Sequence, residues 1–149
     1  MMRKSKRLWW IGGLILPLVL GAVSVPASAG ITVVVSAGNG MTSLTAHQVK
    51  LLFMKKRRRF PDGNTAVPID QAENSAIYRK FANQVLRKDP AQLKAYWSVQ
   101  VFSGNGSPPK QVHGDRAVKA LVSGSPYAIG YIDSASVDDS VKVVFAVGK

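Results

Sequence analysis

The stretch Ile31-Thr32-Val33-Val34-Val35-Ser36-Ala37-Gly38-Asn39-Gly40, continued by residues 44–53, decides the class of fold. Residues 31–35 are β-branched throughout, which predicts a buried strand, and the next five residues favour a turn. Thr45, with Gln48 three residues later, forms a capping box and therefore predicts the start of a helix. A strand that passes through a polar turn into an amphipathic helix indicates an α/β fold.

The residues after this unit continue to alternate between strands and helices. Residues 66–70 predict a short strand, in which Pro68 is compatible only with an edge position or a strand end. Asp89, Pro90 and Gln92 suit the N-cap, first and third positions of a helix. Other patterns predict helices over about residues 75–86 and 114–123, a loop over 103–109, a left-handed C-cap at Gly124, and strands over 127–132 and 141–147.

These elements define the predicted fold class, which is α/β with a small mixed sheet flanked by helices. The aromatic residues Phe81, Tyr96, Trp97 and Phe102 recur at helical spacing and are expected in the core. Residues 30–149 are expected to form a single domain, because a chain of this size buries enough surface for one core.

The first 29 residues have the order of a signal peptide. The basic start MMRKSKR precedes an apolar stretch over residues 8–23, and Ala27-Ser28-Ala29 supplies a small-residue cleavage site. Glycine and proline interrupt the stretch, which is shorter than the roughly 20 residues that span a bilayer. We therefore expect a bacterial protein that is periplasmic or secreted, with no transmembrane segment after cleavage. The absence of cysteine excludes disulfides and thiolate metal sites.

Most of the net charge of +12 comes from this leader and from one short run of cations. Without the four leader cations the charge is +8, and five of the remaining cations are Lys55, Lys56, Arg57, Arg58 and Arg59. This run is either a solvated loop or a basic edge that docks on a protein or on an anionic cell-envelope surface. Nucleic acid is not an expected partner, because exported proteins rarely meet it and the run lacks interleaved aromatic residues.

Several motifs together resemble one known family. They are Leu44 to Phe53, Phe60-Pro61-Asp62-Gly63 after the basic run, Val67-Pro68-Ile69-Asp70, Tyr96-Trp97, Phe102-Ser103-Gly104, Pro108-Pro109-Lys110 and Ala128-Ile129-Gly130-Tyr131. Together they resemble the type 2 periplasmic binding protein-like domain of phosphate ABC transporter substrate-binding proteins, in particular its small exported members. Full-length members close two lobes on an oxyanion, so the resemblance implies that this chain forms about one lobe.

The resemblance also implies a phosphate-type ligand, held by hydroxyls and backbone N–H groups at helix N-termini. The matching segment here contributes Gln71, Asn74 and Ser75, although Glu73 within it would repel an anion. A second candidate group is Asn39, Thr42 and Ser43, in the loop before the first helix. Capping alone explains residues of these types at a helix start, so binding and capping remain alternatives.

Catalysis and cofactor binding are not expected. His47 lies in the first helix and His113 in a loop, with no nucleophile, base or carboxylate placed by any known motif. Asp133, Asp138 and Asp139 form an acidic turn without the spacing of a calcium loop. The sequence therefore predicts an exported, non-enzymatic protein that binds phosphate or a similar oxyanion, without metal or cofactor. The alternative is an interaction module that has lost the pocket and docks through its basic edge.

Overall fold

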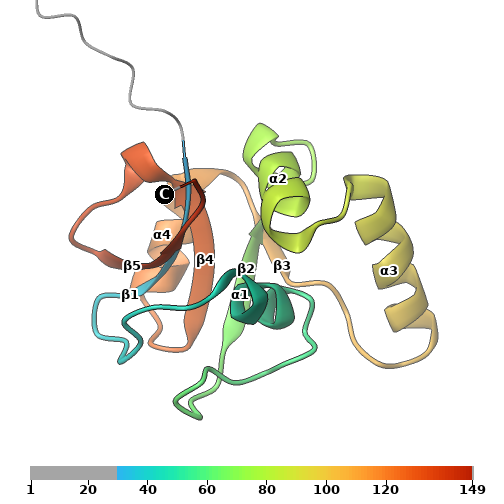
Figure 1. Ribbon diagram of the computed structural model, residues 1–149, viewed down its shortest axis with the longest axis horizontal. Helices are drawn as coiled ribbons and strands as arrows, with labels where there is room; N and C mark the ends of the chain where they lie inside the picture. The colour runs from blue at the N-terminus through green and yellow to red at the C-terminus, as the bar shows by residue number, and fades with distance from the viewer. Residues whose placement is uncertain (1–29, 149) are drawn as a thin grey trace, which may run out of the picture.

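The computed structural model describes residues 30–148, and the predicted signal peptide lies outside these described residues. Five strands form one mixed sheet in the order β3-β2-β4-β1-β5 (Figure 1). Strand β1 is antiparallel to both β4 and β5, whereas β2 is parallel to β3 and β4. The strands are β1 Ile31–Ser36, β2 Val67–Gln71, β3 Lys110–Val112, β4 Ala128–Asp133 and β5 Val141–Ala146.

Helices cover both faces of this sheet, which confirms the predicted fold class. The helices are α1 Ala46–Phe53, α2 Ala76–Phe81 with a π-helical continuation over Ala82–Leu86, α3 Pro90–Phe102 and α4 Gly114–Ser123. Helices α1 and α2 pack on the face that carries Val33 and Tyr131, and α4 packs on the opposite face against Val34 and Ile132. Residues of β1 on both faces of the sheet are buried, which explains why apolar residues dominate the strand without alternating with polar ones.

The two capping boxes have the geometry that the sequence predicts. The Thr45 side chain accepts from the Gln48 N–H at 3.1 Å, and the Gln48 side chain accepts from the Thr45 N–H at 2.8 Å. Asp89 and Gln92 repeat this exchange at the start of α3. Each box pairs two amides that a helix start would otherwise leave without partners.

Glycine is required on the face of β4 that α4 covers. A Cβ atom on Gly130 would lie 2.5 Å from a methyl carbon of Val118, which is closer than packed carbons approach. Helix α4 therefore rests directly on the backbone of β4, and Val118 is completely buried there.

Three local predictions need correction or completion. Strand β3 was not predicted, because three residues show no periodicity and its strand character comes from pairing with β2. Pro68 lies near the start of β2, where β3 does not yet pair, so the strand end rather than the sheet edge accommodates it. Gly124 has φ −82°, so the left-handed C-cap prediction is wrong, because the helix ends in a right-handed turn with the Gly124 N–H on Ala120 O.

The predicted core aromatics of α3 lie mostly at its surface. Leu93 is the one buried side chain of this helix, Tyr96 and Trp97 are half-buried, and Phe102 is 94% exposed. The prediction for Phe102 is wrong because α3 stands away from the sheet, with its far end projecting from the molecule (Figure 1). Phe81 is buried as predicted.

Candidate functional site

The end of β2 and the start of α2 place two predicted site residues beside one cavity. Gln71 is 1% exposed, and its side-chain amide donates to Asp115 Oδ1 at 2.7 Å and to Tyr131 O at 3.1 Å. Ser75 is the N-cap of α2, where its hydroxyl accepts from the Tyr78 N–H at 3.2 Å and donates to Ala72 O at 2.7 Å. Ser75 therefore caps the helix, and this position also places it beside the cavity.

The start of α4 faces the same cavity from the opposite side. His113 is the N-cap residue and makes no side-chain cap hydrogen bond, so the first amides of α4 have no side-chain acceptor. Gly114, the first residue of α4, adopts φ +84°, a backbone conformation that glycine tolerates at little cost, and it lines the cavity together with the start of α2. Two helix N-termini thus meet at one site, where their partial positive charges favour an anion.

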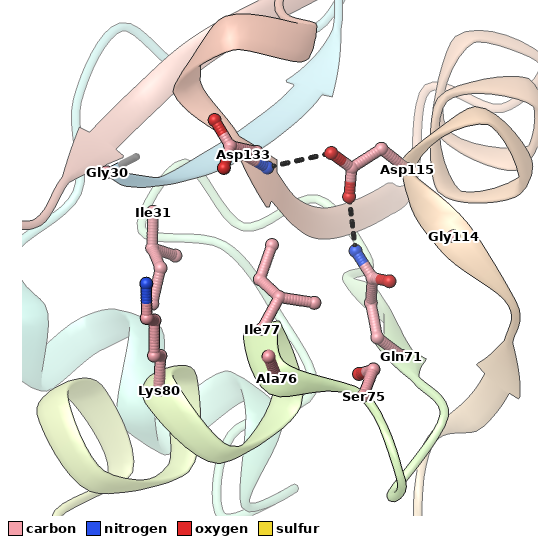
Figure 2. Close-up of a pocket in the computed structure, with 10 residues that line it drawn as sticks. All are labelled: Gly30, Ile31, Gln71, Ser75, Ala76, Ile77, Lys80, Gly114, Asp115 and Asp133. Carbon is pink, nitrogen blue, oxygen red and sulfur yellow. Dashed lines mark hydrogen bonds between the residues drawn. The ribbon is translucent and has the colours of Figure 1, made fainter. Parts of the chain in front are cut away.

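The cavity between them has a volume of about 420 Å³ (Figure 2). Its lining consists of Gly30, Ile31, Gln71, Ser75, Ala76, Ile77, Lys80, Gly114, Asp115 and Asp133. Lys80 is the one cation of this lining, whereas Asp115 and Asp133 contribute two carboxylates. A bound anion would therefore depend on Lys80 and on backbone amides to offset the two acids.

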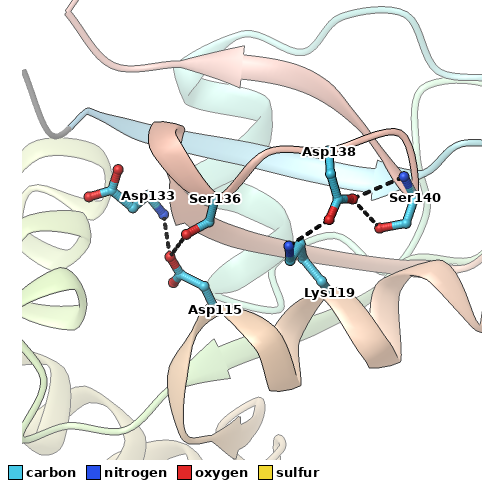
Figure 3. A network of polar contacts seen from close by, with 6 residues as sticks. All are labelled: Asp115, Lys119, Asp133, Ser136, Asp138 and Ser140. Atoms are coloured by element: carbon cyan, nitrogen blue, oxygen red, sulfur yellow. Dashed lines mark hydrogen bonds and ion pairs between the residues drawn. The ribbon is translucent and has the colours of Figure 1, made fainter. Parts of the chain in front are cut away.

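Asp115 is tied into a hydrogen-bond network that reduces its availability to a ligand. One carboxylate oxygen accepts from Gln71 Nε2 at 2.7 Å, and the other accepts from the Asp133 N–H at 3.1 Å and from Ser136 Oγ at 2.7 Å. Figure 3 shows this network joining α4 to the segment between β4 and β5. These three donors occupy the carboxylate, so Asp115 orients Gln71 rather than standing free in the cavity.

A second buried polar pair, Asp70 and Tyr131, adjoins Gln71 in the sheet. The Tyr131 hydroxyl donates to Asp70 Oδ1, which also accepts from the Gln71 N–H at 2.9 Å. Burial raises the pKa of Asp70 to about 6, although the bonds from Tyr131 and from the Gln71 amide oppose that shift. Burial and the neighbouring Asp70 carboxylate raise the pKa of the Tyr131 hydroxyl. Phe81 stacks on the Tyr131 ring with centroids 3.8 Å apart.

Sequence reasoning did not identify this Asp70–Tyr131 pair. Both residues stand in the segments that carry the family resemblance, but their side chains meet only across the neighbouring strands β2 and β4. The one local signal was an aspartate at the end of an apolar strand segment, since a buried carboxyl requires a partner.

Glu73 does not face the cavity between α2 and α4. Its exposed side chain lies beside a groove under α3, 3.5 Å from Gln111 Nε2. Asn74 is also exposed, and its backbone oxygen accepts from Arg79 Nη1 at 3.0 Å. The anion repulsion expected from Glu73 therefore falls on another part of the surface.

The second predicted group lies in the loop between β1 and α1 and does not line this cavity. Asn39 is 7% exposed, and its side chain donates to Pro126 O at 2.7 Å and accepts from the Met41 N–H at 2.7 Å. The Lys142 ammonium donates to the backbone oxygen of Asn39. Thr42 and Ser43 are exposed. The fold thus uses Asn39 to fix its loop and keeps this group apart from Gln71 and Ser75.

The basic run folds back from α1 instead of extending it. Lys55 takes a left-handed conformation with φ +53°, and the Arg57 N–H donates to Leu51 O at 3.0 Å. Lys56, Arg57, Arg58 and Arg59 are exposed, whereas the flanking Phe53 and Phe60 are each 2% exposed. The run therefore presents cations without an aromatic stacking surface beside it.

The remaining ionisable candidates are dispersed. His47 is exposed on α1 and His113 precedes α4. Asp138 forms an ion pair with Lys119 at 2.7 Å, and the bonds from Lys119 and Ser140 lower the pKa of Asp138 to about 2 (Figure 3). Within residues 30–148, no cluster of three or more His, Cys, Asp or Glu side chains could hold a metal ion. No helix in this part of the chain has the length and apolarity to span a membrane.

Solved structures with the same arrangement of strands and helices identify the fold. A Clostridium perfringens protein assigned to the phosphate ABC transporter substrate-binding class, solved with bound phosphate, superposes with a TM-score of 0.63 at 24% sequence identity. The chain has the fold of a phosphate-binding-protein lobe. An ABC-type phosphate transport receptor from Vibrio cholerae and PstS from Borrelia burgdorferi superpose with TM-scores of 0.60 and 0.58, at 18% and 12% identity.

These likenesses cover 78% of this chain but only 44% to 46% of the three solved chains. The protein thus spans less than half the length of the binding proteins that it resembles. No protein-family model matches the sequence, and no curated protein matches it. The predicted resemblance to phosphate-binding proteins is confirmed at the level of this lobe.

Proposed function

We propose that this protein is an exported, non-enzymatic binding protein of the bacterial periplasm or cell exterior, and that it holds phosphate or a similar oxyanion between α2 and α4. The observation that supports this most is the meeting of two helix N-termini at a cavity that also receives Gln71, Ser75 and Lys80. Unpaired first-turn amides and the helix dipole both favour an anion at such a place. The solved relative with bound phosphate has the same fold.

Each lining group would have a separate role toward an oxyanion. The amides of Ala76 and Ile77 at the start of α2, and those of Gly114 and Asp115 at the start of α4, would donate to its oxygens. Lys80 would neutralise part of its charge. Asp115 accepts from Gln71, Ser136 and the Asp133 amide. These bonds would hold the start of α4 in place against the end of β2, which leads into α2. Because a single lobe leaves the cavity open to water, we expect an affinity weaker than that of a closed two-lobed site.

The alternative function is an interaction module whose pocket no longer binds an anion. Its supporting observation is the pair of carboxylates, Asp115 and Asp133, that line the same cavity. The Ser75 hydroxyl is also already engaged with Ala72 and Tyr78. In this alternative the protein would act through its surface, in which the basic run is the most strongly charged segment.

A matched pair of substitutions at Ser75 tests the oxyanion proposal without removing the helix cap. Asparagine and aspartate are both good N-cap residues, but Ser75→Asp adds a negative charge at the cavity and Ser75→Asn does not. We expect Ser75→Asn to retain most of the phosphate affinity and Ser75→Asp to lose at least about tenfold, by like-charge repulsion. Calorimetric titration with phosphate and with sulfate measures both variants against the parent protein.

A second pair of substitutions tests the cation. Lys80→Gln should weaken phosphate binding by severalfold, whereas Lys94→Gln, an equal change of charge on α3, should leave binding unchanged. Equal affinity in the parent, Ser75→Asp and Lys80→Gln proteins would remove the site from this cavity. A ligand at 1,000 times its Kd adds about 4 kcal/mol to the free energy of unfolding. If neither phosphate nor sulfate raises the unfolding temperature at such a concentration, the interaction-module alternative is favoured.

A further inference from the structure

Helix α3 and the start of β2 carry several exposed apolar side chains. Helix α3 exposes Val99 by 63%, Val101 by 55% and Phe102 by 94%, and Val67 at the start of β2 is 46% exposed. An isolated exposed apolar residue is ordinary, but a helix end that leaves a phenylalanine almost fully in water is not. This end of α3 makes little contact with the rest of the fold, because Leu93 near its start is the one side chain of the helix that is buried.

The loop that leaves α3 joins these apolar residues to the cations. Gly106 and Ser107 line a groove of about 350 Å³ together with Lys55, Arg57 and Arg58. The next residue, Pro108, accepts from the Lys55 ammonium at 3.4 Å and also lines the groove that contains Val101 and Phe102. In Figure 1 the chain leaving α3 runs back toward the middle of the molecule, where β3 and α1 lie. The cationic groove and the exposed end of α3 are therefore neighbours on one continuous surface.

Lys55, Arg57 and Arg58 form no ion pair within the part of the chain that the structure describes. Lys119–Asp138 is the single ion pair found within residues 30–148, and it lies between α4 and the segment before β5. No carboxylate lines the groove of Lys55, Arg57 and Arg58, whereas Asp70 and Glu73 line the neighbouring groove of Val101 and Phe102. Burial and the nearby Arg58 guanidinium lower the pKa of the Lys55 ammonium, which indicates that like charges are held together there. An external anion would relieve this repulsion.

We propose that the face formed by Lys55, Arg57 and Arg58 with Val67, Val101 and Phe102 docks on an anionic phospholipid surface. Lipid headgroup phosphates would pair with the three cations, and the Phe102 and Val101 side chains would enter the boundary between headgroups and acyl chains. A bilayer of anionic lipid offers both kinds of contact side by side, which is the combination that interfacial binding requires. A protein partner would have to place an acidic patch and an apolar pocket at matching positions, whereas an anionic lipid surface supplies both kinds of contact everywhere.

Vesicle co-sedimentation with the exported and processed protein tests this proposal, with processing after Ala29 checked by intact mass. We expect binding to vesicles of phosphatidylcholine with one third phosphatidylglycerol, little binding to phosphatidylcholine alone, and progressive loss of binding as salt rises. Each of Arg57→Gln and Arg58→Gln should lower the partition coefficient by about fivefold, which is the factor for one cation near an anionic surface. Arg116→Gln, an equal change of charge on α4, should not lower it.

Trp97 reports on the apolar half of the face, because it is the one tryptophan outside the leader and lies on α3 close to Phe102. Its fluorescence should shift to the blue on anionic vesicles, and Phe102→Ser should reduce both the shift and the partition coefficient. Binding that ignores salt, or that Arg116→Gln weakens as much as Arg58→Gln, would overturn the proposal. Binding to polyaspartate but not to vesicles, with the same dependence on Arg57 and Arg58, would overturn it in favour of an acidic protein partner. The variants at Ser75 and Lys80 should bind vesicles as the parent does, which separates this face from the oxyanion cavity.

Discussion

The sequence predicts both α3 and α4 as helices that carry apolar residues, yet only α4 is packed against the sheet. Val118 and Val122 of α4 are completely buried against the sheet, and Gly130 of β4 lets the helix approach the strand backbone. Helix α3 is longer but buries only Leu93, and it leaves Phe102 in water. The comparison shows that apolar residues at helical spacing predict a helix with an apolar face, but not what covers that face.

Asp70 tests how well the loosely packed α3 side excludes water. Because the pKa of Asp70 is raised from 3.8 to about 6, the folded protein holds this proton more tightly than the unfolded chain does. Stability from this group is present in full below about pH 4 and is lost as pH rises through 6, a change on the order of 3 kcal/mol. Asp70→Asn keeps an oxygen that accepts from Tyr131 and should remove this dependence.

Urea unfolding of the parent protein and of Asp70→Asn at pH 4.5 and 7.5 should show about 2 kcal/mol of that difference, because the full effect is reached only below the unfolded pKa of 3.8. Asp138 does not interfere, because its pKa is lowered to about 2 and its contribution is lost only in more acidic solution. If both proteins change equally between the two pH values, Asp70 is solvated, and the α3 side of the molecule admits water.

A valine on each helix gives the next largest contrast. Val118→Ala should cost about 2 kcal/mol of unfolding free energy, because it removes two methyl groups from a packed site. Val101→Ala, the same change at a side chain that is 55% exposed, should stay within about 0.5 kcal/mol. Chemical unfolding of the two variants measures both values, and equal losses would mean that α3 is packed in solution by something absent from this structure.

Gly130 and Val118 test how closely α4 approaches the backbone of β4. Gly130→Ala should cost about 1.5 kcal/mol, because its new methyl group would lie 2.5 Å from the Val118 methyl. In the Val118→Ala background the contact at 2.5 Å is removed and a looser contact with Val122 at 3.2 Å remains, so the double variant should be more stable than the sum of the two losses predicts. A double-mutant cycle by urea unfolding gives this coupling energy, and strict additivity would contradict the close approach.

The smallest expected effect concerns the ion pair on the outer side of α4. Lys119→Gln should change the unfolding free energy by less than about 0.5 kcal/mol, since pairs in contact with water contribute little. The loss should shrink further in 1 M salt. A loss above about 1 kcal/mol would show that the segment before β5 depends on Lys119 for its position.

The sequence predicted only some of the residues that line the cavity between α2 and α4. Ser75 and Gln71 were predicted beside a helix start, and the structure places both at the cavity between α2 and α4. Gly114, Asp115 and Lys80 line the same cavity but were not proposed, because they come from two helices that only the tertiary fold brings together. Asn39 looked equivalent to Ser75 in sequence, yet its side chain is used to fasten its own loop to Pro126.

The sequence alone determined most local elements of this protein, because capping boxes, β-branched runs and Gly-Pro loops act through neighbouring residues, whereas β3 forms only by pairing with β2. Thr45, Asp89 and β1 therefore lie where the pattern predicts. The tertiary structure alone decided which apolar faces are covered, where Asp70 meets Tyr131, and that the basic run lies beside the exposed end of α3. Lys55 and Pro108 are 53 positions apart and Asp70 and Tyr131 are 61 positions apart, and no periodicity within one segment encodes such contacts.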